Sequence, residues 1–168
     1  MSADMSQSLA EANLPLRVLV VDDEELARLR LKSLVGECGE PSAVVVGEAA
    51  NAAQALVWLA TRSCDLLLLD VQMPGRDGTQ LAAELRLRTP APAIVFVTAH
   101  AEHALKAFDL EAVDYLTKPV KRERLQAALR RVGGLADDDG ARLVALADQA
   151  LQAQACELFV VDDEHTQR

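Results

Sequence analysis

Five short apolar runs recur along the chain, and four of them show no alternation with polar residues. Uninterrupted apolar runs of this length are typical of parallel strands that are covered on both faces. Each run therefore predicts one buried strand. The runs are RVLVV (17–21), AVVV (43–46), DLLLL (65–69), AIVFV (93–97) and DYLT (114–117).

Between and after these runs, apolar residues recur at the i, i+3, i+4 and i+7 spacing of helices that bury one face. Asn51, followed three residues later by Gln54, predicts a helix N-cap with a capping-box partner. Alternation of strands and helices predicts a doubly wound α/β sheet. The stripes are Ala53, Leu56, Val57 and Ala60; Ala101, Ala104, Leu105 and Phe108; and Leu125, Ala128, Leu129 and Val132.

The polar composition of residues 1–15 predicts a disordered leader, and the alternating pattern places one domain at 16–133. The stretch GGLADDDG breaks the last helix, so residues 134–157 are predicted to be a linker and a further helix. Residues 158–168 begin as a strand and repeat VVDDE, a sequence also present at 20–24. We interpret this end as the start of a truncated output domain or as a tail.

Composition narrows the class of protein. The 168 residues are 51% hydrophobic but only 3% aromatic, so a core is expected and it must be aliphatic. No apolar run approaches the roughly 20 residues that span a bilayer, and the N-terminus does not resemble a secretory signal. Three cysteines without CxxC spacing favour a reducing, cytoplasmic location. A net charge of −9 argues against nucleic-acid binding by this chain alone.

Polar residues stand where four of the predicted strands end. In an open parallel sheet, ligands bind beyond the carboxyl ends of the strands, where the strand order reverses. If the strand order is 2-1-3-4-5, the first and third strands are neighbours and their acids converge in one crevice. Taken singly, each residue has an ordinary alternative as a helix cap, a turn residue or a solvated charge. The residues are Asp22, Asp23 and Glu24, Asp70, Thr98, and Lys118 with Pro119.

Repulsion between carboxylates decides what such a crevice would hold. A pair at about 4 Å costs about 1 kcal/mol in water and about 4 kcal/mol at an effective dielectric constant of 20. A hard divalent cation offsets that cost, which favours Mg²⁺. With Lys118 as a second positive charge, the crevice suits a phosphoryl group, and a carboxylate can accept one covalently.

The segments VLVVDDEELARLRL, LLLLDVQMPGRDG and IVFVTAHAEHALKAFDLEAVDYLTKPV resemble the receiver domain of bacterial two-component response regulators. The last of them is most similar to the LytR/AlgR subgroup. The resemblance covers about residues 17–132, with every motif in order. It implies a flavodoxin-like (CheY-like) sheet of five parallel strands in the order 2-1-3-4-5, to which this chain would add a C-terminal helix.

The resemblance also implies roles for single residues. Asp70 would be the phosphoacceptor, Lys118 would pair with the phosphoryl group, and Thr98 would hydrogen-bond to it. Thr98 and Tyr115 would form the switch, since Tyr115 stands where the family has its switch aromatic. The Lys118–Pro119 bond is expected to be cis, as in the family.

The same resemblance supplies the metal ligands. Mg²⁺ would be bound by Asp23 directly, by Asp22 through water, by Asp70, and by the backbone carbonyl of Gln72. Gln72 and His100 flank the site and would modulate the lifetime of the phosphoryl group. His100 has two rival roles, as a general base or as a metal ligand.

The implied partner is a sensor histidine kinase, and phosphorylation is expected to promote a homodimer. LytR/AlgR proteins carry a DNA-binding output domain, the LytTR domain, after the receiver. Too few residues follow Gly134 for that domain, so DNA would be bound only through a part missing from this chain, and no membrane is involved. The second VVDDE is not expected to be a site, because no acceptor acid, hydroxyl or Lys-Pro pair follows it.

The function expected from the resemblance is that of a phosphorylated receiver, which is not itself an enzyme. Two other functions remain open. A stand-alone phosphate-relay or interaction module would use the same sheet. A Mg²⁺-dependent phosphohydrolase with an aspartyl nucleophile would need a second acid two residues after Asp70, where this chain has Gln72. The chain has neither GxGxxG nor GxxxxGK[ST], which argues against a nucleotide site.

Overall fold

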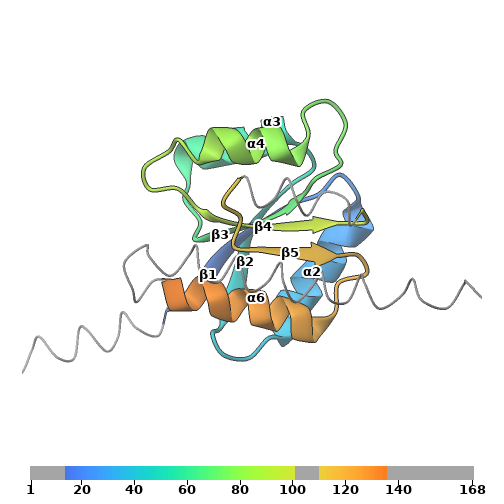
Figure 1. The fold of residues 1–168 in the computed structure, drawn as a ribbon, viewed down its shortest axis with the longest axis vertical. Helices are drawn as coiled ribbons and strands as arrows, with labels where there is room; N and C mark the ends of the chain where they lie inside the picture. The colour runs from blue at the N-terminus through green and yellow to red at the C-terminus, as the bar shows by residue number, and fades with distance from the viewer. Residues whose placement is uncertain (1–13, 101–109, 136–168) are drawn as a thin grey trace, which may run out of the picture.

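The computed structural model describes residues 14–100 and 110–135. These residues form one parallel sheet of five strands in the order β2-β1-β3-β4-β5, so the predicted fold class and strand order are confirmed (Figure 1). The strands are β1 (Leu16–Val21), β2 (Ala43–Ala49), β3 (Leu66–Asp70), β4 (Ala93–Thr98) and β5 (Asp114–Thr117). The helices are α2 (Glu25–Glu37), α3 (Ala52–Thr61), α4 (Gly78–Leu85) and α6 (Arg122–Leu135).

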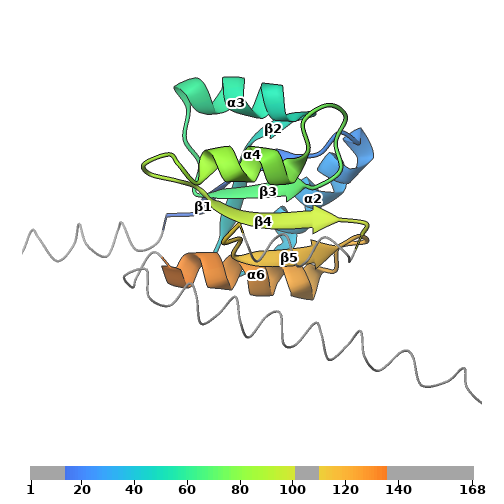
Figure 2. The same ribbon diagram turned by 45° about the horizontal axis from the view of Figure 1, so that its top comes forward.

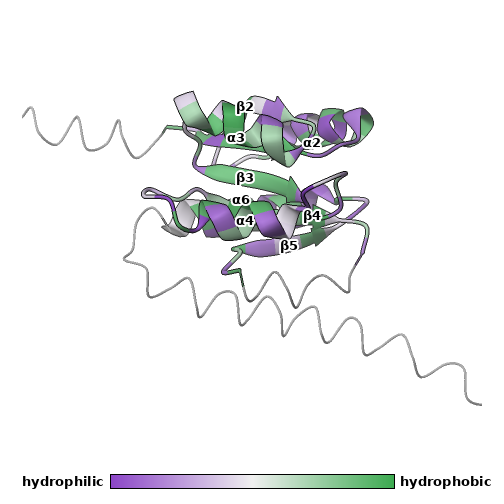
Figure 3. Cartoon of the chain, turned by 90° about the horizontal axis from the view of Figure 1, so that it is seen from above, coloured by the Kyte–Doolittle hydropathy of each residue, from purple (hydrophilic) through white to green (hydrophobic). Residues whose placement is uncertain are grey.

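Helices cover both faces of the sheet and create two aliphatic cores. Helices α3 and α4 lie over one face, and α2 and α6 lie over the other (Figures 1 and 2). Strand β3 lies in the middle of the sheet and is hydrophobic along most of its length in Figure 3, because four of its five residues are leucines. Its leucines are fully buried and point alternately into the two cores, with Leu67 and Leu69 in one and Leu66 and Leu68 in the other. Burial of each such side chain stabilises the fold by about 1.5 to 3 kcal/mol.

One predicted helical stripe is confirmed and another is wrong. In α6, all four predicted residues, from Leu125 to Val132, are buried. In α3, the residues that are buried are Ala52 and Ala55, whereas Val57 is 74% exposed. Helix α3 is rich in alanine and aliphatic residues on all sides, so its spacing alone does not determine which face packs on the sheet.

The N-terminal ends of α3 and α4 show how local sequence fixes these helices. The Asn51 side chain accepts a hydrogen bond from the Gln54 backbone N–H at 2.9 Å, which confirms the N-cap. The Gln54 side chain accepts from the backbone N–H of Ala50 rather than that of Asn51, so the capping-box part of this prediction is wrong. A complete capping box occurs instead at α4, between Asp77 and Gln80.

Several predictions lie outside the described residues. They are the helix with Ala101 and Phe108, the leader up to residue 13, the helix within 134–157, and the second VVDDE within 158–168. Across residues 14–100 and 110–135, the structure contains no helix with the length and apolar character needed to cross a membrane.

Candidate functional site

The acids of the candidate site stand at the carboxyl ends of two hydrogen-bonded strands. Val21 of β1 pairs with Leu69 of β3, so Asp22 and Asp70 are the next residues on neighbouring strands. Carboxylate oxygens of Asp22, Asp23 and Asp70 all lie within 4.8 Å of one another. The convergence predicted from the strand ends is therefore present.

Backbone amides of the following loops hold two of these carboxylates. Asp22 Oδ1 accepts from the Glu24 N–H at 2.9 Å, and Asp70 Oδ1 accepts from the Gln72 N–H at 3.2 Å. Both bonds join a residue to the amide two positions later, as in an Asx turn. Each turn fixes its aspartate and leaves the other carboxylate oxygen, Oδ2, for another partner.

Lys118 supplies that partner. Its Nζ lies 2.8 Å from Asp22 Oδ2 and 3.3 Å from Asp70 Oδ2. The lysine follows β5, and its backbone N–H donates to the Thr98 carbonyl at 2.8 Å. The Lys118–Pro119 peptide is cis, as predicted. One ammonium group thus contacts two carboxylates that come from different strands.

Thr98 and Tyr115 are linked through the backbone of His100. Thr98 is fully buried at the end of β4, one position beyond Val97, which pairs with Asp70. Its hydroxyl accepts from the His100 N–H at 3.3 Å, and the Tyr115 hydroxyl donates to the His100 carbonyl. The predicted switch residues are therefore joined by a short hydrogen-bonded path.

The surroundings raise the pKa of both Asp70 and Lys118, which disfavours the charged form of Asp70 and favours the charged form of Lys118. Burial raises the pKa of the Asp70 carboxyl to about 6, and the Asp22 charge adds to this rise, against the opposing influence of Lys118 and the Gln72 N–H. Burial lowers the pKa of Lys118, but the close Asp22 carboxylate and the charge of Asp70 outweigh burial and leave the pKa above its ordinary value. Lys118 is consequently a stable cation, whereas Asp70 carries an unusually costly negative charge.

The donor set fits a hard divalent cation. Asp22 Oδ2 is buried and accepts no well-aligned hydrogen bond, although it is ion-paired with Lys118. Asp23 is exposed and faces the same group of oxygens, which leaves the cluster open to solvent on one side. Carboxylate oxygens with residual negative charge and access for water are what Mg²⁺ requires.

One contact to the site was not predicted from the sequence. Arg28, in the first turns of α2, donates from Nη1 to the backbone carbonyl of Asp22 at 2.8 Å. An arginine so close to the start of a helix gives no sequence signal for this role, because its contact is with the main chain.

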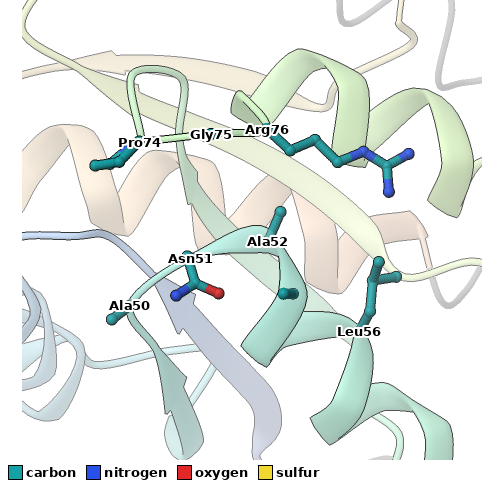
Figure 4. Close-up of a pocket in the computed structure, with 8 residues that line it drawn as sticks. Ala50, Asn51, Ala52, Leu56, Pro74, Gly75 and Arg76 are labelled. Atoms are coloured by element: carbon teal, nitrogen blue, oxygen red, sulfur yellow. The ribbon is translucent and has the colours of Figure 1, made fainter.

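A pocket of about 380 Å³ has none of the three acids in its lining. It is lined by residues 50–53 and Leu56 around the start of α3, and by residues 74–76 of the loop before α4, which face each other across the space (Figure 4). None of the predicted site residues lines it. The predicted site residues therefore lie at the strand ends and not in this pocket.

Comparison with known proteins shows the family to which this fold belongs. Residues 18–130 match the family model for the response regulator receiver domain. The chain is 47% identical over 116 residues to the positive alginate biosynthesis regulatory protein of Pseudomonas aeruginosa, covering 69% of this chain and 46% of that protein. It is 35% identical over 132 residues to the transcriptional regulatory protein LytR of Staphylococcus aureus, covering 77% and 53%. The chain thus spans about half the length of these curated relatives.

The fold of the response regulatory domain of mrkE from Klebsiella pneumoniae is also similar, with a TM-score of 0.66 at 33% identity, covering 73% of this chain and 98% of that one. The chain belongs to the response regulator receiver family. Its relatives place it in the LytR/AlgR subgroup, which confirms the resemblance noted in the sequence.

Proposed function

We propose that this receiver accepts a phosphoryl group on Asp70 from a sensor histidine kinase, with Mg²⁺, and that this modification switches a transcriptional output. One observation carries the proposal. The Asp70 carboxylate lies 3.3 Å from the Lys118 ammonium and within 4.8 Å of the Asp22 and Asp23 carboxylate oxygens. Among the acids of the cluster, Asp70 alone ends the central, fully buried strand β3.

The residues divide the work of phosphoryl transfer. An Asp70 oxygen attacks the phosphorus of a phosphohistidine, the new O–P bond forms as the N–P bond breaks, and the imidazole leaves and takes a proton from solvent. Lys118 pairs with the transferred group, and the Thr98 hydroxyl donates to one of its oxygens. Asp22, Asp23, Asp70 and the Gln72 carbonyl would hold Mg²⁺, which would neutralise charge on the phosphoryl oxygens.

Acetyl phosphate with Mg²⁺ tests the acceptor directly. We expect intact-mass spectrometry to show one added phosphoryl group on the wild type and none on Asp70→Asn. Asp65→Asn is the matched control. Asp65 stands just before β3, at the end of the strand opposite to Asp70. The side-chain oxygen of the new asparagine can still accept the hydrogen bond from the Arg17 N–H. Phosphorylation of Asp70→Asn at the wild-type rate would refute the assignment.

We propose that the switch runs through His100. If the Thr98 hydroxyl turns toward the phosphoryl group, it releases the His100 N–H, and the His100 carbonyl and Tyr115 follow. A change at this end of β4 and β5 would favour a homodimer. Beryllofluoride is a stable substitute for the phosphoryl group. Light scattering should show a larger mass for the wild type with beryllofluoride than without it. Tyr115→Phe should need more beryllofluoride to dimerise.

We also propose that the domain is a phosphoacceptor and not a phosphohydrolase. Gln72, two residues after Asp70, has a side-chain amide that cannot exchange a proton as a general acid or base at neutral pH. We expect no turnover of aryl phosphates beyond the slow loss of phosphate from Asp70 itself. Multiple turnover that survives in Asp70→Asn would contradict this.

A further inference from the structure

Strand β2 contains a bulge that changes the direction of every side chain after it. Val18 of β1 pairs with Val45, but the next residue, Leu19, pairs with Gly47, so Val46 has no partner in the register. Because side chains alternate between faces along a strand, one extra residue reverses the alternation beyond it. After the bulge, each side chain of β2 therefore points to the face of the sheet opposite to the one it would face in a regular strand.

The reversal places Glu48 on the face covered by α2. Glu48 pairs with Val20, whose side chain lies in the core beneath α2 and α6, whereas Ala49 pairs with Val21 and lies in the core beneath α3 and α4. On the α2 side, Glu48 Oε1 lies 3.5 Å from Arg28 Nε, and Glu48 Oε2 lies 2.8 Å from Lys32 Nζ. A regular strand would direct Glu48 toward α3.

Arg28 connects this glutamate to the acid crevice. Its guanidinium donates to the Asp22 carbonyl at 2.8 Å, while the Asp22 N–H donates to the Ala49 carbonyl at 3.1 Å. Both sides of the Asp22 main chain are thus tied to the end of β2, one directly and one through Arg28 and Glu48. The Arg28 side chain is 17% exposed, so its position is fixed by the surrounding structure.

We propose that Arg28, held by Glu48, is a positioning residue for Mg²⁺ binding: it fixes the turn that presents the Asp22 and Asp23 carboxylates to the cation. The inference rests on the Mg²⁺ site of the proposed function. Groups that orient metal ligands without touching the metal change affinity by about 10-fold to 100-fold. Arg28 acts through the Asp22 backbone, so loss of its guanidinium lets the turn move away from Asp70.

The sign of the effect separates positioning from simple electrostatics. Removing a positive charge close to an acidic crevice strengthens cation binding if charge alone matters. If Arg28 positions the turn, its removal weakens binding instead. Lys32 is the matched control, since it is a cation on the same helix that pairs with the same glutamate.

Titration calorimetry with Mg²⁺ on the full chain measures the effect without phosphorylation. We expect Arg28→Ala to raise the Mg²⁺ Kd about 10-fold and Lys32→Ala to leave it unchanged or slightly lower. Glu48→Gln should raise the Kd less than Arg28→Ala, and the double variant should be no worse than Arg28→Ala, because both act through one contact.

An Arg28→Ala protein that is folded, by thermal melting in EDTA, and binds Mg²⁺ as tightly as the wild type would overturn the proposal. If Arg28→Ala does not fold, Glu48→Gln decides, since Glu48 is an exposed residue, and an unchanged Kd would overturn it equally. Failure of the proposed function is a separate result: the wild type would then bind Mg²⁺ without becoming phosphorylated, or would not bind it.

Discussion

At the scale of single residues, the cost of the negative charge on Asp70 is the feature with the clearest consequence. The pKa of Asp70 is raised from 3.8 to about 6, mainly by burial. A carboxyl with a raised pKa in the folded state binds its proton more tightly there than in the unfolded chain. Its contribution to stability is therefore fully present below about pH 4 and is lost as the pH rises through 6.

We expect this loss to appear as a difference between wild type and Asp70→Asn in Mg²⁺-free buffer. The asparagine has no proton to lose, so Asp70→Asn should gain stability relative to wild type between pH 4.5 and 7.5. After allowance for solvent screening, the gain is about 2 kcal/mol. Urea unfolding of both proteins across this pH range measures it. A difference that does not vary with pH would mean that Asp70 titrates normally.

Gly78 is a second residue with a sharp requirement, because its backbone meets that of Asp70. A Cβ at this position would lie 2.1 Å from the Asp70 carbonyl oxygen, and the Gly78 N–H donates to the Val71 carbonyl at 2.9 Å. We expect Gly78→Ala to cost about 2 to 3 kcal/mol in unfolding free energy and to weaken Mg²⁺ binding, since the loop after β3 must shift.

Gly36→Ala is the control for that variant. Apart from its chain neighbours and the backbone of its own helix, no atom lies within 4 Å of a Cβ built at Gly36. Gly36 is exposed in the last turn of α2, so alanine there should stabilise the protein by up to about 1 kcal/mol. Chemical denaturation of the two variants would compare them. Equal effects of the two substitutions would show that the contact at Gly78 relaxes without cost.

The residues that meet at the site could be predicted from the sequence, but the residues that hold their backbone in place could not. Asp22, Asp70 and Lys118 follow apolar runs, so the geometry of a parallel sheet brings them to one edge whatever the details of packing. Arg28 and Gly78 act on backbone carbonyls, which look alike at every position of a sequence. Asp114 was also missed as a charged residue, because it lay inside a run interpreted only as a strand.

At the scale of elements, Asp114 joins β5 to α6. Its carboxylate is 1% exposed and pairs with Arg131 and, at 3.4 Å, with Arg124, whose side chains are 24% and 39% exposed. The negative charge of Asp114 is therefore shielded from water, whereas the positive charges of the two arginines are partly exposed to it. The carboxylate depends on the arginines, whereas each arginine can reach solvent.

This inequality predicts an asymmetric response to substitution. Arg131→Ala should cost about 3 kcal/mol, because it leaves a buried carboxylate with the Tyr115 N–H and only one, more distant, cation. Asp114→Asn should cost only about 1 kcal/mol, because both arginines can be hydrated. Urea unfolding at pH 7 compares the two variants. A larger cost for Asp114→Asn would show that the arginines, and not the carboxylate, depend on the pair.

The helices show where the spacing of apolar residues predicts the buried face and where it does not. The α6 stripe was correct because charged residues and one glutamine occupy most of the other positions of that helix and favour a single buried face. The apolar residues of α3 continue around the helix, so burial follows the small Ala52 and Ala55 that permit close approach to the sheet. The bulge at Val46 interrupts a run of three valines, in which no residue marks the extra position.

At the scale of the whole molecule, Mg²⁺ should stabilise the folded chain because the unfolded chain lacks the crevice. At 100 times its dissociation constant, Mg²⁺ should raise the unfolding free energy by about 2.7 kcal/mol. Asp23→Asn should reduce this gain, and since Asp23 is exposed it should not lower the stability of the metal-free protein. Thermal melting with Mg²⁺ and with EDTA tests both. A wild-type melting temperature indifferent to Mg²⁺ would count against the metal site.

The way the sheet assembles the site has a consequence for protein synthesis. Asp22 follows β1, Asp70 and Thr98 end β3 and β4, and Lys118 follows β5, 48 residues after Asp70. A chain emerging from the ribosome exposes Asp70, the proposed acceptor, well before the lysine that pairs with it is made. The site is complete only when the last strand has joined the sheet. A kinase that depends on this site would thus ignore nascent and half-folded copies, and every phosphorylated molecule would be one that had finished folding.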